Sequence, residues 1–250
     1  MRIDRASVSA LLLVGVLVGV LAPAVLLGGC AGSPPTFAWV ELTPGLRVDV
    51  AQRVVEFDGE IAVDAHHEDS PTVWLELFVT GPDSREHESL VVTRVRPSLI
   101  HAAMLAAGFE PGEPGRVRVD RFGDVQRARA TGEAVRVEFV LLEGSRETAH
   151  DPARWAGHVH TGEVLADHPA WRGFVFAGSR EVQREGRAWY DADGTGVVVG
   201  LTTFGSEVIA PGLTLSPESG IDEAAWVALA SEVPEQGEPV RVRVWGVLGD

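Results

Sequence analysis

Short segments with the pattern of β-strands recur along the chain from about residue 37 onward. Some alternate apolar and polar residues, which is typical of a strand with one buried face, and others are rich in β-branched residues. Turn signals containing glycine separate many of them, at 58–59, 81–83, 113–115, 193–194 and 235–237. The segments expected to be strands are 46–50, 53–57, 72–80, 90–95, 116–119, 133–142, 174–176, 188–190, 196–202 and 240–247.

Two segments carry helical signals instead. Leu99–Ala107 is rich in alanine and leucine, with Ser98 placed to cap it and Gly108 placed to end it. A second helix is expected over Asp222–Ser231. We found no internal repeat and no clear domain boundary. The pattern therefore predicts an α+β fold, mostly β, in a single compact domain.

The segment Asp191–Gly196 resembles the start of a calcium-binding loop. The glutamate that such a loop needs at its twelfth position is replaced here by Thr202. The preferred interpretation is therefore a hairpin turn that joins the strands expected at 188–190 and 196–202.

The N-terminal residues have the layout of an export signal. Arg2 and Arg5 precede an apolar run over Ala10–Leu27, and Gly28-Gly29-Cys30 follows it. Small residues directly before a cysteine resemble the bacterial lipobox, in which the thiol is acylated, for example with palmitate, and the cysteine becomes the new N-terminus. Cys30, the only cysteine of the chain, is therefore the predicted site of lipidation.

This interpretation divides the chain into three parts. Residues 1–29 are the expected lipoprotein signal peptide, residues 30–36 are the lipidated cysteine and a short tether, and residues 37–250 are the folded domain. Six extended residues after the cysteine reach at most about 20 Å, so the domain is expected close to a membrane of the cell envelope, on its periplasmic or extracytoplasmic side. The expected partner at this end is the lipid bilayer itself.

Two alternatives remain open for the same segment. The apolar run is nearly long enough to be an uncleaved transmembrane anchor, although Gly15, Gly19 and Pro23 weaken it as a permanent helix. An ordinary cleaved signal with a chance cysteine is the other alternative. All three interpretations place the folded part outside the cytoplasm.

Composition excludes several functions. Cleavage removes 29 of the 250 residues and leaves 221, and the loss of two arginines and one aspartate takes the net charge from −15 to −16. Such a charge disfavours nucleic acid and anionic headgroups as partners. The chain has no lysine, which excludes Schiff-base chemistry, and an acylated Cys30 leaves no free thiol for cysteine catalysis. No cofactor is expected.

Several short motifs resemble the YdjY-domain family of bacterial exported proteins. The more specific ones are Glu86-His87-Glu88-Ser89-Leu90 and Pro97-Ser98-Leu99-Ile100-His101-Ala102-Ala103, followed by Gly108 and Pro111-Gly112. Arg85 stands where family members often have lysine. The later matching pieces are Trp171, Phe176-Ala177-Gly178-Ser179, Tyr190, Asp193-Gly194 and Phe204-Gly205-Ser206. The resemblance spans about 40–247 and implies a domain type and export, but no mechanism.

The densest polar cluster is Glu86, His87, Glu88 and Ser89, between two expected strands. On a strand the two glutamates share one face, whereas in a turn His87 could approach Ser89 or His101. This group is the candidate site for acid–base chemistry or metal binding. A hydrogen-bonded loop that supports the following helix is the structural alternative, and we favour it.

His158 and His160 share one face if they lie on a strand, and such a pair can contribute to a metal site. A third ligand would come from His168, His66 or His67. The spacing is common in proteins, so exposed histidines without a metal remain the preferred interpretation.

The sequence contains no Gly-x-Ser-x-Gly motif of a serine hydrolase. Most tryptophans are expected in the core, although Trp155, His168 and Trp171 lie in a loop-rich stretch and could line a carbohydrate or peptide groove. We therefore expect a non-catalytic binding or envelope-structural module with an envelope protein or glycan as partner. The alternative is a metal-dependent or Glu/His acid–base hydrolase.

Overall fold

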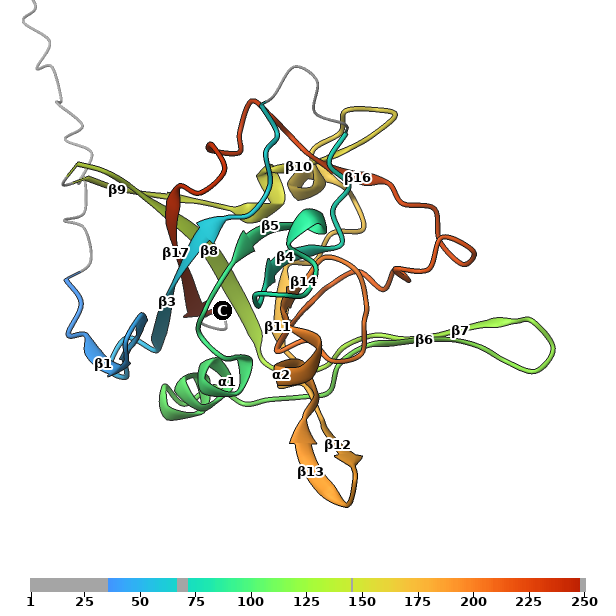
Figure 1. Cartoon of the computed structure of the whole chain (residues 1–250), viewed down its shortest axis with the longest axis horizontal. Helices are drawn as coiled ribbons and strands as arrows, with labels where there is room; N and C mark the ends of the chain where they lie inside the picture. Colours follow the sequence, from blue (N-terminus) through green and yellow to red (C-terminus); the bar gives the residue numbers. More distant parts are fainter. Residues whose placement is uncertain (1–35, 67–71, 145, 248–250) are drawn as a thin grey trace, which may run out of the picture. The chain divides into compact units, whose positions relative to one another are not determined.

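Eight strands form a closed sheet in the computed structural model, which describes residues 36–66, 72–144 and 146–247 (Figure 1). The order around the sheet is β3-β17-β8-β11-β15-β14-β4-β5, and β5 pairs with β3 to close it. Two of the pairings, β4–β5 and β14–β15, are parallel. The strands are β3 (Val54–Ile61), β4 (Leu77–Thr80), β5 (Ser89–Val92), β8 (Ala134–Glu143), β11 (Phe174–Phe176), β14 (Val197–Gly200), β15 (Ile209–Pro211) and β17 (Pro239–Gly246).

The remaining strands lie at the edges of the closed sheet or outside it. β1 (Val40–Thr43) and β2 (Leu46–Asp49) continue from β3, and β9 (Arg146–His150) pairs with the far end of β8. Three two-stranded ribbons complete the fold, and two of them are hairpins that extend away from the closed sheet (Figure 1). These ribbons are β6 (Arg116–Val119) with β7 (Val125–Ala128), β12 (Glu181–Arg184) with β13 (Arg187–Tyr190), and β10 (Ala156–His158) with β16 (Trp226–Ala228).

The helices are short. α1 (Pro97–Ala106) packs against β2 and β3 and buries Ile100, Ala103 and Met104. α2 (Asp191–Thr195) follows β13 directly and contacts α1. The single-turn 3-10 helices are η1 (Glu86–Glu88), η2 (Pro152–Arg154) and η3 (Leu165–Asp167).

The core fills the inside of the closed sheet. Alternate residues of β8 and β17, such as Val137, Phe139, Val242 and Val244, are almost completely buried, because strand side chains alternate between the two faces. This cluster draws its buried members from residues 46–244. The described residues from 37 onward accordingly form a compact unit with a core of its own.

The mostly β fold, its single domain and the helix at α1 are confirmed, but several local predictions are wrong. Asp222–Ser231 is not a helix, because Trp226–Ala228 form β16 and pair with β10. The 58–59 turn lies inside β3, where Gly59 passes close to Val91. The predicted hairpin turn at 191–196 is instead helix α2. β13 forms its hairpin with the preceding strand, β12, and does not pair with the following strand, β14.

The expected signal peptide and Cys30 lie outside the described residues, as does the tether as far as residue 35. Within the described ranges, no helix is both long and apolar enough to cross a membrane.

Candidate functional site

The Glu86–Ser89 segment forms η1 and the start of β5, and its side chains point to different partners. Glu86 accepts hydrogen bonds from the backbone N–H groups of Asp83 (2.5 Å) and Ser84 (3.1 Å). Ser89 is buried and donates its hydroxyl to the carbonyl of Arg85 at 2.7 Å. The side chain of His87 is 77% exposed. Glu86 and Ser89 therefore hold the turn together.

Glu88 belongs to a second group, which includes a residue that the sequence did not single out. Arg85 lies between two carboxylates, with its Nη1 2.6 Å from Glu76 and 3.3 Å from Glu88. Burial and the nearby Glu88 carboxylate together raise the pKa of Glu76 to about 7. Glu76 can therefore hold a proton near neutral pH.

His101 lies away from this group, on α1, and pairs with Tyr190 at the end of β13. The hydroxyl of Tyr190 donates to the carbonyl of Gly178 at 3.0 Å, so its oxygen accepts from Nδ1–H of His101 at 2.7 Å. Burial lowers the pKa of His101, which favours the neutral ring. A hydrogen bond of the ring with the backbone carbonyl of Gly178 opposes this lowering of the His101 pKa, so the ring has a partner besides Tyr190.

A cavity of about 420 Å³ adjoins this histidine, and several motifs of the family resemblance line it. Gly178 has a positive φ of 78°, and a side chain there would meet Pro111 at 2.7 Å, so glycine is required. None of Glu86–Ser89 lines this cavity, and no hydrogen bond joins them to His101 within the described ranges. The lining includes Ser98, His101, Pro111, Gly112, Gly178, Ser179, Arg180 and Tyr190.

The weak metal candidates gather around the indole of Trp226. The rings of His158 and His168 both meet it edge to face, at 5.6 and 5.5 Å between centroids. Nδ1 of each histidine accepts a backbone N–H, from His160 and Ala170 respectively. His160 lies beyond the end of β10. Of the two other candidate ligands, His66 forms a hydrogen bond with the carbonyl of Val233, and residue 67 lies outside the described ranges. The described residues contain no group of three or more His, Cys, Asp or Glu arranged to hold a metal ion.

One wall of the closed sheet is interrupted along the edge of β8. β9 pairs with β8 as far as His150 opposite Phe139, and β11 begins with Phe174 opposite Val135. Both strands run antiparallel to β8 on the same edge, so they follow one line with a break between them. The chain leaves this line over residues 151–173, which contain η2, β10 and η3. Among the described residues, none pairs as a strand with 136–138 of β8 on this edge.

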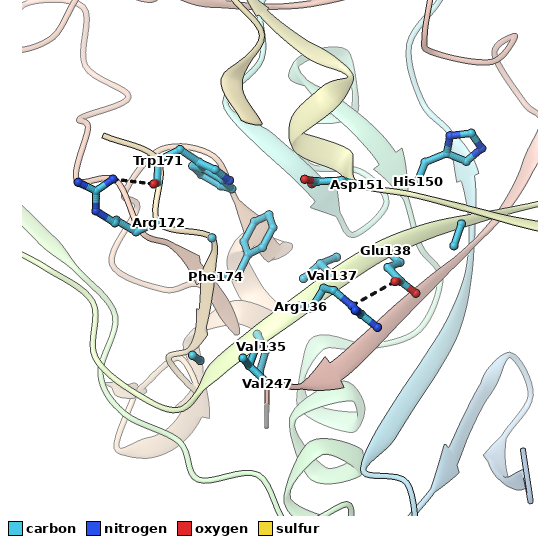
Figure 2. Close-up of a pocket in the computed structure, with 13 residues that line it drawn as sticks. Val135, Arg136, Val137, Glu138, His150, Asp151, Trp171, Arg172, Phe174 and Val247 are labelled. Atoms are coloured by element: carbon cyan, nitrogen blue, oxygen red, sulfur yellow. Dashed lines mark hydrogen bonds and ion pairs between the residues drawn. The ribbon is translucent and has the colours of Figure 1, made fainter. Parts of the chain in front are cut away.

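A second cavity of about 420 Å³ occupies this break (Figure 2). Figure 2 shows Trp171 and Phe174 on the β11 side and Val135 and Val137 on β8, while the ion pair of Arg136 and Glu138 lies on the rim. The wall is largely apolar, and His150, Asp151 and Arg172 add polar groups around it. Of the predicted groove residues, Trp171 lines this cavity, whereas Trp155 is buried in the core and His168 packs on Trp226.

Sequence reasoning missed Glu76, Tyr190 as the partner of His101, and the whole β8 edge. The sequence around Glu76 predicts only a strand, and no local sequence signal indicates that Glu76 lies close to Glu88. The break in the wall is visible only once β9 and β11 are known to share one edge of β8.

The fold and its cavities define a mostly β, single-domain protein with cavities in or beside a closed sheet. The family model of the YdjY domain matches residues 46–245, so the chain belongs to the YdjY-domain family. No curated protein and no solved structure matches the chain.

Proposed function

We propose that this chain is an exported, lipid-anchored member of the YdjY-domain family that acts as a non-catalytic binding module of the cell envelope. The N-terminal arginines, the apolar run and the Gly-Gly-Cys30 motif support export and anchoring. The cavity in the sheet wall supports the binding role and is the observation on which this proposal depends.

That cavity has the properties of a ligand site. Its volume falls within the range of sites for small ligands, and its walls are mainly apolar with a few polar groups at the rim. It is set in the wall of a closed sheet, whose strands hold the lining residues in place. Trp171 and Phe174 provide aromatic surface, which contributes strongly to the binding of apolar groups.

A neutral apolar dye tests this role. Residues 37–250 contain the whole closed sheet and core, so this unit can be titrated with N-phenyl-1-naphthylamine without interference from a lipid anchor. Ala149 is exposed on the cavity rim, and Ala149→Trp should block the site, whereas Ala128→Trp on the distant β7 serves as the matched control. We expect saturable binding in the unaltered unit and the control, with at least about tenfold weaker binding after Ala149→Trp. Absence of saturable binding, or equal binding by both variants, contradicts the proposal.

A second candidate function, acid–base catalysis, has one specific observation in its favour. His101 lines a cavity, burial favours its neutral ring, and its Nδ1–H is held by Tyr190, as in a general base oriented by a neighbour. A pH-dependent hydrolytic activity that disappears in His101→Gln, with the fold intact, would favour this alternative over the binding module.

A further inference from the structure

The break between β9 and β11 leaves a specific part of the backbone without a partner. The carbonyl of Ala134 accepts from the N–H of Val247, on the side of β17. Backbone groups alternate in direction along a strand, so Arg136 and Glu138 also face β17 while Val137 faces the break. No hydrogen bond to the N–H or C=O of Val137 is found on this edge within the described residues.

We propose that this gap binds an extended peptide segment of three residues with an apolar central side chain, which pairs with Val137 as an added strand. This inference rests on the proposed binding function and names the ligand class of the same cavity. An unpaired strand edge is a template for another chain, and the addition of a peptide strand to such an edge is a recurring recognition mode.

The register sets the length of the segment. From Val135, paired with Phe174, to Phe139, paired with His150, β8 advances by four residues, or about 14 Å. Three residues of β8 lie between these two pairs, so a segment of three extended residues completes the line of β9 and β11. Its central residue exchanges both of its backbone hydrogen bonds with Val137.

The side chains set the sequence preference. Residues directly opposite one another in an antiparallel pair project to the same face, and the side chain of Val137 is 2% exposed and points into the core. The central side chain of the ligand therefore enters the space beside Val135, Trp171 and Phe174. Its two neighbours project outward with Arg136 and Glu138, whose ion pair suits polar side chains.

A purely apolar ligand such as an acyl chain fits this site less well. It would fill the space between Phe174 and Trp171 but would displace water from the N–H and C=O of Val137 without replacing its hydrogen bonds, which is unfavourable. A peptide satisfies both the apolar walls and the backbone of Val137.

Three peptides provide the test, measured by ¹H–¹⁵N NMR titration of residues 37–250. The probe is acetyl-Thr-Val-Thr-amide. One analogue carries an N-methyl group on the central valine, which removes the N–H that faces Val137. The matched control peptide carries the N-methyl group on the last threonine, whose N–H points away from β8. The two N-methylated peptides have the same mass and apolar area.

We expect the probe and the control to shift the amide signal of Val137 most strongly, and the valine N-methyl analogue to bind roughly three- to tenfold more weakly. A Val137→Pro variant, which removes the facing N–H but no bond to β17, should weaken the probe similarly. The peptide series gives the answer even if this variant does not fold.

Three outcomes overturn the inference. If all three peptides bind equally, the cavity accepts apolar groups without strand pairing. If no peptide binds while the naphthylamine dye does, the binding function stands and the ligand class is wrong. If the Val137 amide is already protected from hydrogen exchange without any peptide, the chain itself closes the gap.

Discussion

Asp193 on α2 caps the N-terminus of α1 through hydrogen bonds with Ser98, which lies 95 residues earlier in the sequence. Its Oδ1 accepts from the backbone N–H of Ser98 at 2.8 Å, and its Oδ2 accepts from the Ser98 hydroxyl at 2.7 Å. Arg96 adds an ion pair to the same carboxylate at 2.7 Å. The contact holds α1 against the end of the β12–β13 hairpin, and this arrangement places His101 beside Tyr190.

Replacement of this carboxylate should therefore destabilise the fold. Asp193→Ala removes a capping acceptor and a charge that complements the helix N-terminus, and we expect a loss of about 1–2 kcal/mol in the free energy of unfolding. Asp193→Asn keeps an acceptor and should lose less. Urea unfolding measures both, with Glu113→Ala as a control because Glu113 is exposed. A loss in the control as large as that of Asp193→Ala would show that the cap is not the cause.

This cap also shows what the sequence could and could not predict at α1. Composition and Gly108 predicted a helix over Leu99–Ala107, within two residues of the observed bounds at each end. Ser98 was the expected cap, but Arg96 occupies that position and Pro97 is the first helical residue, which fits its fixed φ and missing N–H. The acceptor comes instead from a segment that local signals identified as a hairpin turn. Local rules predict the elements, whereas contacts between distant segments depend on the tertiary fold.

Glu76 should make stability depend on pH. Because its pKa is raised from 4.5 to about 7, the folded state binds a proton more tightly than the unfolded chain does. The ionised Glu76 carboxylate destabilises the folded state. This destabilisation is absent below pH 4.5, grows as the pH rises, and is complete above about pH 7. We expect Glu76→Gln to be about 1–3 kcal/mol more stable than the unaltered protein at pH 8 and to differ little at pH 4.

The neighbouring carboxylate provides the matched control for this effect. Glu88→Gln removes the second cause of the shift, so it should recover only part of the gain at pH 8. Thermal unfolding across pH 4–8 gives all three curves. A pH-independent difference between Glu76→Gln and the unaltered protein would rule out a raised pKa as its origin.

A buried row of charges crosses the outside of the closed sheet. Glu56 on β3 is 1% exposed and lies opposite Arg47 on β2 and Arg243 on β17. Nε of Arg243 donates to it at 2.6 Å, and Nε of Arg47 at 2.8 Å. Because Glu56→Ala leaves the buried Arg243 without this partner, we expect a loss of about 3–5 kcal/mol in urea unfolding. As a control, Glu41→Ala on the exposed β1 should change the free energy of unfolding by less than about 0.5 kcal/mol. A similarly small effect of Glu56→Ala would contradict the role of Glu56 as the stabilising partner of Arg243.

The candidate site illustrates a further limit of the sequence. The dense motif Glu86–Ser89 attracted attention because its polar residues are adjacent, yet Glu86 and Ser89 bond within the turn and His87 faces solvent. Val137 carries no polar side chain, so no motif could mark it. Its unpaired backbone arises from the path of residues 151–173, which is a property of topology rather than of residue type.

Lipidation at Cys30 makes a prediction about the mass of the protein in its native envelope. If the signal is processed as a lipoprotein, the mature chain has lost 29 residues, begins at Cys30 and carries acyl chains that hold it in the membrane. Cys30→Ser removes the thiol, so the precursor should keep residues 1–29 and accumulate at higher mass without acyl groups. Intact-mass spectrometry of both forms is the measurement, and Ser33→Ala in the tether is the control that should process normally.

An unacylated chain that begins after residue 30 indicates an ordinary signal, and an unaltered protein that retains all 250 residues indicates an uncleaved anchor. Either result refutes the lipoprotein while leaving the cavity at Val137 unaffected.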